Sequence, residues 1–373
     1  MKRLKVAFLF TFLILASILK AQSPKYHLLI GTYTSPGKSE GIYVYEFDSG
    51  TGAMTYKSKA MIESPSYFAL TSNRKFVYAV TEGKGNKISA FAFDVKTGNL
   101  NFLNSQPTGS NGPTYISVDA KGEYVFAANY GGGSITALPL EPDGTLGADI
   151  QDIKHEGSSI ARKKPFVHSA ILSPDNKYVL TADLGTDKIN IYRFNAKKRP
   201  RALSPAVQPF ILLDPGSGPR HLTFHPNKKF LYSVTEINSK VYAFKYTGGS
   251  LSHIQSVSML TEGFTGPGHG ADIHVSPDGK FLYANTRSTV NEIAIYSIDQ
   301  KTGMLSLIDK QPSLGKSSRT FEIDPSGHWL LSTSQASNEI IAFRRDIETG
   351  KLSPSSQKIQ IDKPSLVKFV PID

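Results

Sequence analysis

Short runs in which apolar and polar residues alternate recur along the chain from about residue 65 onward. One example is "PRHLTFHPNKKFLYSVTEINSKVYAFKY", which starts at Pro219. It contains an alternating run, a turn rich in Pro, Asn and Lys, a second apolar run, a polar loop and a third run. Alternation with a period of two, interrupted by turn residues, predicts short β-strands. No stretch beyond the first twenty residues has helical periodicity, so we predict an all-β protein.

This unit occurs six times, and an aromatic residue begins the second strand of each copy. The intervals between these aromatic residues are 48, 54, 52, 51 and 48 residues. The aromatic residues are Phe76, Tyr124, Tyr178, Phe230, Phe281 and Trp329. A repeat of about fifty residues that contains four antiparallel strands is typical of a β-propeller blade.

The two ends of the chain supply incomplete units that complement each other. Near the N-terminus, "KYHLLIGTYT" and "GIYVYEFD" match the second and third strands, whereas "PSLVKFVP" (364–371) matches a first strand. Together they predict a seventh blade, which closes the ring and removes its open sheet edges. The sequence therefore predicts one seven-bladed propeller domain, residues 22–373, with four antiparallel strands per blade.

The first 21 residues have a different pattern. Three basic residues (Lys2, Arg3 and Lys5) precede an apolar run from Val6 to Leu19. This arrangement predicts a secretory signal peptide (1–21) that is too short for a comfortable membrane span. We therefore expect an exported protein, periplasmic or secreted, with no stable membrane span after cleavage. The alternative is that the segment stays as an N-terminal membrane anchor.

Composition narrows the possible partners. The chain has no cysteine, which excludes disulfides and thiolate metal sites. Its formal net charge of +11 falls to +7 without residues 1–21. The basic runs "ARKKP" (161–165) and "NAKKRPR" (195–201) are interpreted as solvated loops, because export argues against a nucleic-acid partner. The histidines and carboxylates show no metal-ligand spacing, so we predict neither a metal nor another cofactor.

The repeat also predicts which residues meet at the central channel. The innermost strand of a blade begins, and the antiparallel second strand ends, at the same mouth of the channel. The columns at these positions place His168, Arg220, Glu236 and Arg287 at that mouth, on three consecutive blades. Charged groups there need water, one another or a ligand. A ligand site and a self-satisfied ion-pair cluster in a wet channel are the two interpretations.

Further polar residues are expected to support this ring. They are Asn129, Asp183, His221, His269 and Arg319. By contrast, His274 lies inside the alternating run "DIHVSP" and is expected to be a core histidine with its hydrogen bonds satisfied.

At these positions the chain resembles a known family. The matching phrases are "LIGTYT" (29–34), "AANYGGGS" (127–134), "VHSAILSPDNKYVLTADLGTDKI" (167–189), "GPRHLTFHPNKKFLYSVTEI" (218–237) and "GADIHVSPDGKFLYANTR" (270–287). They resemble the lactonase family of seven-bladed propellers, which includes cycloisomerase-type 6-phosphogluconolactonases and carboxy-muconate lactonizing enzymes. The resemblance implies an active-site histidine, arginine, glutamate and second arginine at His168, Arg220, Glu236 and Arg287. One difference is that Ser288 and Thr289 follow the last arginine, where relatives commonly have Gly-His.

The resemblance implies hydrolysis of a sugar lactone, a small-molecule substrate that need not be phosphorylated if the protein is exported. Arg220 would polarise the carbonyl, Arg287 would bind a carboxylate or phosphate, and Glu236 or His168 would act as general base. Two alternatives stay open. One is a lactonizing cycloisomerase that acts on an unsaturated dicarboxylate, and the other is a non-catalytic propeller that binds carbohydrate or a protein.

Overall fold

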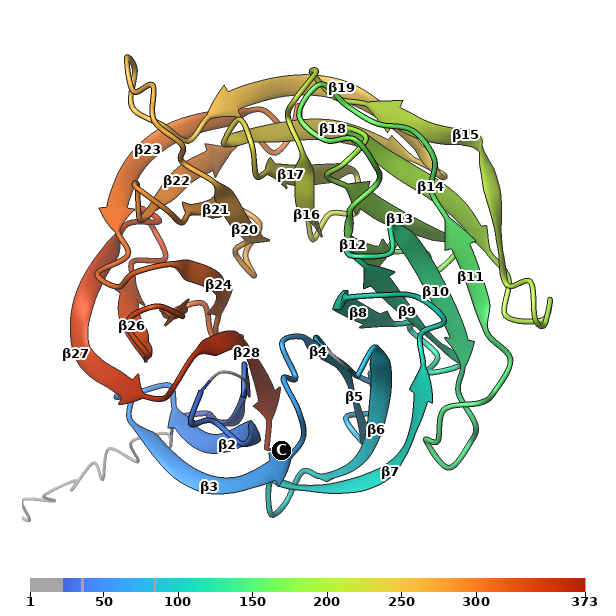
Figure 1. The fold of residues 1–373 in the computed structure, drawn as a ribbon. Coiled ribbons are helices and arrows are strands. Elements are labelled where there is room, and N and C mark those ends of the chain that lie inside the picture. Colours follow the sequence, from blue (N-terminus) through green and yellow to red (C-terminus); the bar gives the residue numbers. More distant parts are fainter. Residues whose placement is uncertain (1–22, 35–36, 84, 373) are drawn as a thin grey trace, which may run out of the picture.

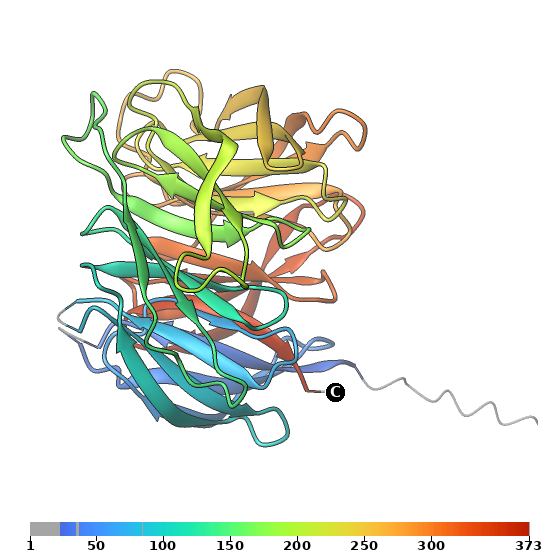
Figure 2. The ribbon, with the colours of Figure 1, turned by 90° about the vertical axis from the view of Figure 1, so that its right-hand side faces the viewer.

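The computed structural model describes residues 23–34, 37–83 and 85–372, and these residues form strands, turns and loops. Their twenty-eight strands make seven four-stranded antiparallel sheets around a central axis (Figure 1). Figure 2 shows the ring from the side, with most strands running between its two faces. The predicted all-β seven-bladed propeller is confirmed, whereas the predicted signal segment, 1–21, lies outside the described residues.

In each blade the strands follow one another from the centre of the ring outward. The innermost strands are β4 (Phe68–Leu70), β8 (Pro113–Val118), β12 (Val167–Leu172), β16 (Pro219–Phe224), β20 (Gly270–Val275), β24 (Ser318–Ile323) and β28 (Pro364–Pro371). The second strands are β1 (Lys25–Thr32), β5 (Phe76–Thr81), β9 (Tyr124–Asn129), β13 (Tyr178–Asp183), β17 (Phe230–Thr235), β21 (Phe281–Thr286) and β25 (Trp329–Ser334). Each of the six repeated aromatic residues begins a second strand, as predicted.

The third and fourth strands complete each blade toward the rim. The third strands are β2 (Gly41–Asp48), β6 (Lys87–Asp94), β10 (Ser134–Pro139), β14 (Lys188–Phe194), β18 (Lys240–Thr247), β22 (Glu292–Ile298) and β26 (Glu339–Arg345). The outermost strands are β3 (Met54–Met61), β7 (Asn99–Pro107), β11 (Gln151–Lys154), β15 (Leu203–Leu212), β19 (Ser250–Ser258), β23 (Leu305–Pro312) and β27 (Leu352–Gln360).

Strands from both ends of the chain share one blade. The C-terminal strand β28 pairs antiparallel with β1, with Leu28 opposite Phe369, and the sheet order is β28-β1-β2-β3. In Figure 1 the dark red β28 lies beside the blue strands of this blade. This shared sheet closes the ring, as predicted from the complementary incomplete units.

Glycine turns lock neighbouring blades together. Gly249, between β18 and β19, has φ +84°, and a Cβ added there would lie 2.2 Å from Cε1 of Tyr178 on the neighbouring blade. Tyrosine hydroxyls reinforce such contacts: Tyr232 donates a hydrogen bond of 3.0 Å to the carbonyl of Gly303. The close contact between a turn glycine and an aromatic ring recurs for Gly52 and Trp329, Gly144 and Phe76, Gly303 and Phe230, and Gly350 and Phe281.

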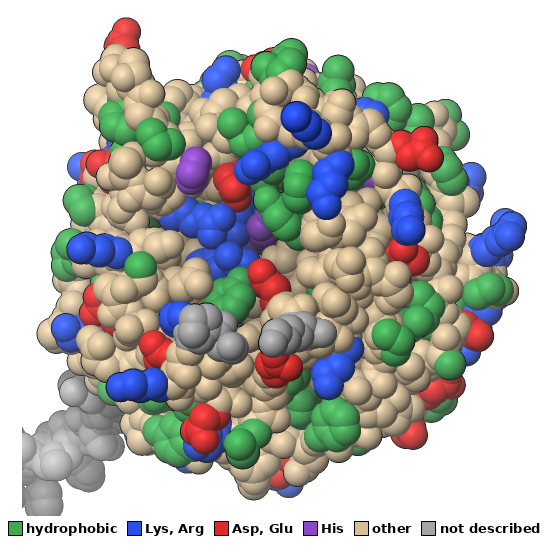
Figure 3. Space-filling model, viewed as in Figure 1, with side chains coloured by type: hydrophobic (Ala, Val, Ile, Leu, Met, Phe, Trp, Pro, Cys, Tyr) green, Lys and Arg blue, Asp and Glu red, His purple; other side chains and the backbone are tan. Residues whose placement is uncertain are grey.

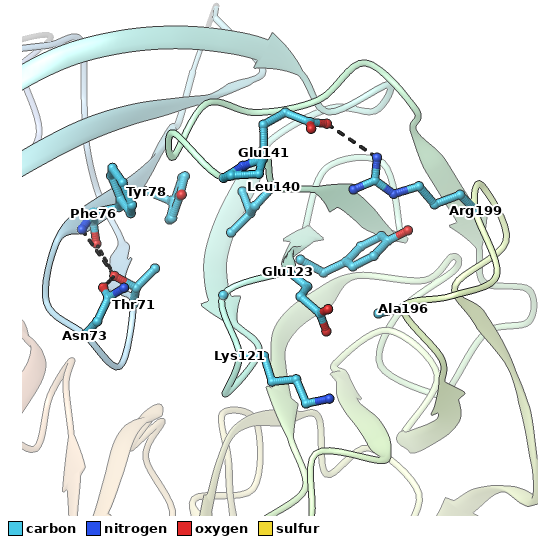
Figure 4. A pocket seen from close by; sticks show the side chains of 13 residues that line it. Thr71, Asn73, Phe76, Tyr78, Lys121, Glu123, Leu140, Glu141, Ala196 and Arg199 are labelled. Atoms are coloured by element: carbon cyan, nitrogen blue, oxygen red, sulfur yellow. Dashed lines mark hydrogen bonds and ion pairs between the residues drawn. The ribbon is translucent and has the colours of Figure 1, made fainter.

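The connection between β14 and β15 departs from this pattern because the basic run 195–201 replaces the glycine turn. The Arg199 guanidinium lies 6.0 Å from the centre of the Tyr124 ring and 3.4 Å from Oε1 of Glu141. A cavity of about 540 Å³ lies between this connection and the neighbouring blades (Figure 4). None of the nine predicted site residues lines this cavity.

Candidate active site at the channel mouth

The innermost strands carry a β-bulge at the end where the predicted ring lies. The register of β16 shifts between Pro219 and His221, and that of β12 shifts around His168. A bulge leaves one residue unpaired and changes where the neighbouring side chains point. In β16 the extra residue is Arg220, and its Nη1 lies 3.4 Å from Nε2 of the adjacent His221. The bulge thus lets two consecutive side chains lie on one side of a strand.

Arg220, Glu236 and Arg287 meet at one oxygen atom. The Nε of Arg220 and the Nη2 of Arg287 each donate a hydrogen bond of 3.1 Å to Oε2 of Glu236. The Arg220 side chain is fully buried, whereas Glu236 and Arg287 are 13% and 19% exposed. Figure 3 shows a hollow at the centre of this face, where side chains of lysine or arginine gather beside histidine and carboxylate groups. The structure thus brings together three of the four predicted catalytic residues.

His168 is the fourth, and it packs against the same group. Its ring lies edge-on to those of His221 and Tyr130, with centroids 5.1 Å and 5.5 Å away. Burial and the nearby Arg220 hold the pKa of His168 well below its ordinary value. The imidazole is therefore neutral at pH 7.

Two buried polar atoms here have no hydrogen-bond partner among the residues that the structure describes. One is Nη2 of Arg220, whose Nε is bonded to Glu236 and whose Nη1 donates to the carbonyl of Ala271. The other is Nδ1 of His168. A buried polar atom without a partner is costly, and such atoms in a folded protein call for an explanation. Both atoms are therefore candidates for binding a polar ligand at this mouth.

The electrostatics of the cluster favour an anionic or electron-rich ligand. Burial and the neighbouring Arg287 lower the pKa of Arg220 to about 9, so the group is still a cation at pH 7. Burial opposes the ionisation of Glu236, but Arg220 and Arg287 outweigh it and hold the pKa of Glu236 below its ordinary value. Two guanidinium groups therefore share one carboxylate, which leaves one positive charge in excess.

Arg319 belongs to a second polar cluster on β24. Its Nη2 lies 3.5 Å from Oε2 of Glu82 and 3.3 Å from Oγ1 of Thr114. The guanidinium also lies over the Tyr33 ring, 5.2 Å from its centre, and the Tyr33 hydroxyl donates a hydrogen bond of 2.6 Å to Glu82. Tyr33 was missed from the sequence because it lies one residue beyond the column that ends β1.

Comparison with known proteins identifies the family. A family model described as "Lactonase, 7-bladed beta-propeller" matches residues 27–369. The chain belongs to this lactonase family. Over 352 residues it is 33% identical to a 6-phosphogluconolactonase of Bacillus subtilis (strain 168), an alignment that covers 93% of this chain and 99% of that one.

Solved structures agree with this assignment. A putative 6-phosphogluconolactonase from Bacteroides fragilis superposes with a TM-score of 0.88 at 37% identity, covering 93% of this chain and 98% of that one. The periplasmic gluconolactonase of Pseudomonas aeruginosa superposes with a TM-score of 0.90 at 32% identity, covering 94% and 100%. The lactonase-family fold thus extends over nearly the whole described chain.

In this lactonase-family propeller, Asp183 supports the strand that carries His168. Its Oδ1 accepts hydrogen bonds from the backbone N–H groups of Phe166 (2.9 Å) and Gly185 (3.0 Å), and its Oδ2 lies 2.8 Å from Nδ1 of His155. These bonds fix the backbone just before β12 begins. Asp183 therefore acts on the backbone that leads into β12.

Asn129 and His269, both predicted to support the ring, contact it to different extents. The buried Asn129 amide donates to Ser134 (3.0 Å) and Thr136 (2.8 Å) within its own blade, so its assignment to the substrate site stays a prediction. The His269 side chain is exposed, but its carbonyl accepts a hydrogen bond of 2.9 Å from the N–H of Arg287. It is the backbone of His269 that contacts the ring.

His274 has hydrogen-bond partners, as predicted, but they are charged groups. Its Nε2 lies 3.1 Å from Oδ2 of Asp272 and its Nδ1 lies 3.6 Å from Oε1 of Glu322. Asp272, which also contacts His221, was not predicted as a site residue. Strict alternation would assign only one of the consecutive residues Ala271 and Asp272 to the channel side of the strand. The register of β20 shifts between Gly270 and Ile273, so alternation does not hold at these two residues.

Two further observations concern other ligands and membranes. Within residues 23–34, 37–83 and 85–372, no group of three or more histidine, aspartate or glutamate side chains could hold a metal ion. The same part of the chain contains no helix with the length and hydropathy of a membrane span.

Proposed function

We propose that this chain hydrolyses a sugar lactone at the channel mouth. The observation that carries the proposal is the Arg220 guanidinium, which is anchored through Nε and Nη1 while its buried Nη2 has no partner. A fixed guanidinium with a free NH₂ group is suited to an oxyanion, because it needs no reorganisation when charge develops. The relatives named as lactonases support the same activity.

In the proposed reaction, a water oxygen attacks the lactone carbonyl carbon while a general base takes one proton from that water. The carbonyl oxygen becomes an oxyanion, which Arg220 Nη2 stabilises by a hydrogen bond and by its charge. The ring C–O bond then breaks, and the leaving oxygen takes the proton back to become a hydroxyl group. The product is a hydroxy acid, which releases one proton to solvent.

We assign the general base to His168. Glu236 is the other candidate, but its Oε2 already accepts two charged hydrogen bonds and its pKa is below the ordinary value. His168 is neutral, and its Nδ1 has no competing partner. Glu236 then holds Arg220 and Arg287 in place and balances part of their charge.

The other arginines are proposed to bind the rest of the substrate. Arg287 donates to Glu236 through Nη2. Arg319 contacts Glu82 and Thr114 at 3.3–3.5 Å. Guanidinium groups bind carboxylates and phosphates through paired hydrogen bonds, and they also bind sugar hydroxyls. This positive rim would accept the acid product and either a plain or a phosphorylated sugar lactone.

We also propose that residues 1–21 direct export and that residues 22–373 form the mature domain. The basic start followed by an apolar run supports this, as does the periplasmic gluconolactonase among the structural relatives. Mass spectrometry of the protein recovered from a cell-envelope fraction tests it. A mature chain that starts near residue 22 is expected, and an intact N-terminus in the cytosolic fraction would contradict it.

The activity is tested by pH-stat titration of D-gluconolactone and its 6-phosphate with the purified protein. Spontaneous opening is subtracted, because δ-lactones hydrolyse without an enzyme. We expect proton release above background on at least one of the two substrates. A rate equal to background on both would overturn the proposal.

A further inference from the structure

A carboxylate–histidine pair lies directly beneath Arg220. The Nδ1 of His221 is 2.7 Å from Oδ1 of Asp272 on the neighbouring blade, and both side chains are buried. The other ring nitrogen of His221, Nε2, lies 3.4 Å from Nη1 of Arg220. Carboxylate, imidazole and guanidinium therefore form a continuous chain that ends at the proposed oxyanion donor.

The contacts of His221 define its tautomer. Burial opposes the ionisation of Asp272, but the imidazoles of His274 and His221 outweigh it and hold its pKa well below the ordinary value. An ionised carboxylate only accepts hydrogen bonds, and an arginine only donates them. Nδ1 of His221 therefore carries the proton and Nε2 presents a lone pair to Arg220. Burial and Arg220 lower the pKa of His221 to about 4, so the ring is neutral, as this tautomer requires.

Asp272 is itself held from several sides. Its Oδ2 accepts hydrogen bonds of 3.1 Å from Nε2 of His274 and 3.1 Å from the backbone N–H of Phe321. His274 in turn faces Glu322, which bonds to Lys368 on β28. The network thus connects β16, β20, β24 and β28, the innermost strands of four consecutive blades. Asp272 has little freedom to move away from His221.

We propose that Asp272, acting through His221, positions the Arg220 guanidinium so that Nη2 faces the substrate. The Nε of Arg220 is bonded to Glu236, and its Nη1 contacts the Ala271 carbonyl and His221. Together these contacts fix the plane of the guanidinium. His221 and Asp272 are positioning residues, because neither is required to touch the substrate. This inference rests on the proposed lactonase activity.

The test replaces His221, whose Nε2 faces Arg220, in two ways. His221→Phe keeps an aromatic ring without an acceptor, whereas His221→Gln can place a carbonyl oxygen near the position of Nε2. We expect kcat to fall about ten- to a hundredfold in His221→Phe, the range typical of groups that orient metal ligands, and to recover largely in His221→Gln. KM should change little in both variants. His253→Phe, at an exposed histidine on β19, is the control and should match the wild type.

Three outcomes contradict the inference. If the His221→Phe and His221→Gln variants lose activity equally and the acid limb of the pH profile disappears, His221 itself accepts the proton from the attacking water. If neither variant changes kcat, the contact does not position Arg220. Finally, ¹⁵N–¹H NMR of the imidazoles, assigned with His221→Gln, should find the proton of His221 on Nδ1. A proton on Nε2 would overturn the inference even if the wild type hydrolysed no lactone.

Discussion

The Nε atom of Arg220 donates a 3.1 Å hydrogen bond to the same Glu236 oxygen that accepts one from Arg287. Within residues 23–34, 37–83 and 85–372, Glu236 is therefore the one carboxylate that forms a salt bridge with both guanidinium groups, and Arg220 is fully buried. Removing one partner of a buried ion pair is strongly destabilising, because the remaining charge is left without compensation. The stability of the mouth and its capacity to bind an anion thus depend on one carboxylate.

Replacing Glu236 with Gln tests this dependence. The amide keeps a hydrogen-bond acceptor but loses the charge between the two arginines, so we expect the free energy of unfolding to fall by about 3 kcal/mol. Urea denaturation of both proteins measures the difference. The control is Glu348→Gln, because Glu348 is 75% exposed in its pair with Lys280 and should matter by less than about 0.5 kcal/mol. Equal small effects in both variants would show that Glu236 does not compensate the arginines.

The pH dependence of the rate tests the proposed role of His168. Its pKa lies well below 6.5, so a base at this position stays unprotonated as the pH falls through 6.5. We expect catalysed kcat/KM to stay flat from pH 7.5 to below 6.5 and to decline only at more acidic pH. His168→Asn should lower kcat about 10²- to 10⁴-fold, the usual contribution of a general base. An acid limb centred at or above 6.5, or an active His168→Asn variant, would contradict the assignment.

The buried histidines also make stability depend on pH. For His168 and His221, the pKa in the folded protein is below the unfolded value, so the unfolded chain binds more protons as the pH falls below about 6.5. Their stabilising contribution is therefore present above that pH and is lost on acidification. For His221 the loss continues down to about pH 4.

The effect of His274 on the pH dependence of stability has the opposite sign, because Asp272 and Glu322 outweigh burial and raise the pKa of His274. Its contribution is present below about pH 6.5 and is lost as the pH rises through the folded value.

We expect His221→Gln to lose less stability than the wild type between pH 7 and pH 4.5, measured as the shift in Tm. An equal loss would contradict the depressed pKa of His221.

Two adjacent glycines provide a matched test of the contacts between blades. Gly248 and Gly249 both have positive φ, +53° and +84°, but only Gly249 has a neighbour within 4 Å of an added Cβ, the Tyr178 ring. Gly248→Ala should cost about 1 kcal/mol for the left-handed backbone. Gly249→Ala should cost about 1–3 kcal/mol more, because the ring must move. Urea denaturation measures both, and equal costs would show that the glycine contact does not lock the blades.

Much of this architecture could be predicted from the sequence because the repeat carries it. Each aromatic residue from Phe76 to Trp329 begins a second strand, and counting from these residues placed Arg220, Glu236 and Arg287 at one mouth. The count relies on second strands of equal length, and the second strands of the six units each span six residues.

The remaining features depend on departures from regularity. The bulge in β16 brings both Arg220 and His221 to the channel, and the register shift in β20 brings in Asp272, whereas alternation permits only one residue of each neighbouring pair. The NH₂ group of Asn129 donates to Ser134 and Thr136, so the predicted role of Asn129 in the ring stays a prediction. Side-chain partners of this kind depend on packing across strands, which the repeat does not encode.

The most direct test of the account compares kcat for lactone hydrolysis between the wild type and Arg220→Lys. Lysine keeps the positive charge, but its three N–H donors share one nitrogen and cannot replace the separate nitrogens by which Arg220 contacts Glu236, the Ala271 carbonyl and the oxyanion. We predict a fall in kcat of about 10²- to 10³-fold with a folded protein, while the exposed Arg193→Lys on β14 stays at the wild-type value. A kcat for Arg220→Lys within about threefold of the wild type would contradict the claim that Arg220 stabilises the oxyanion.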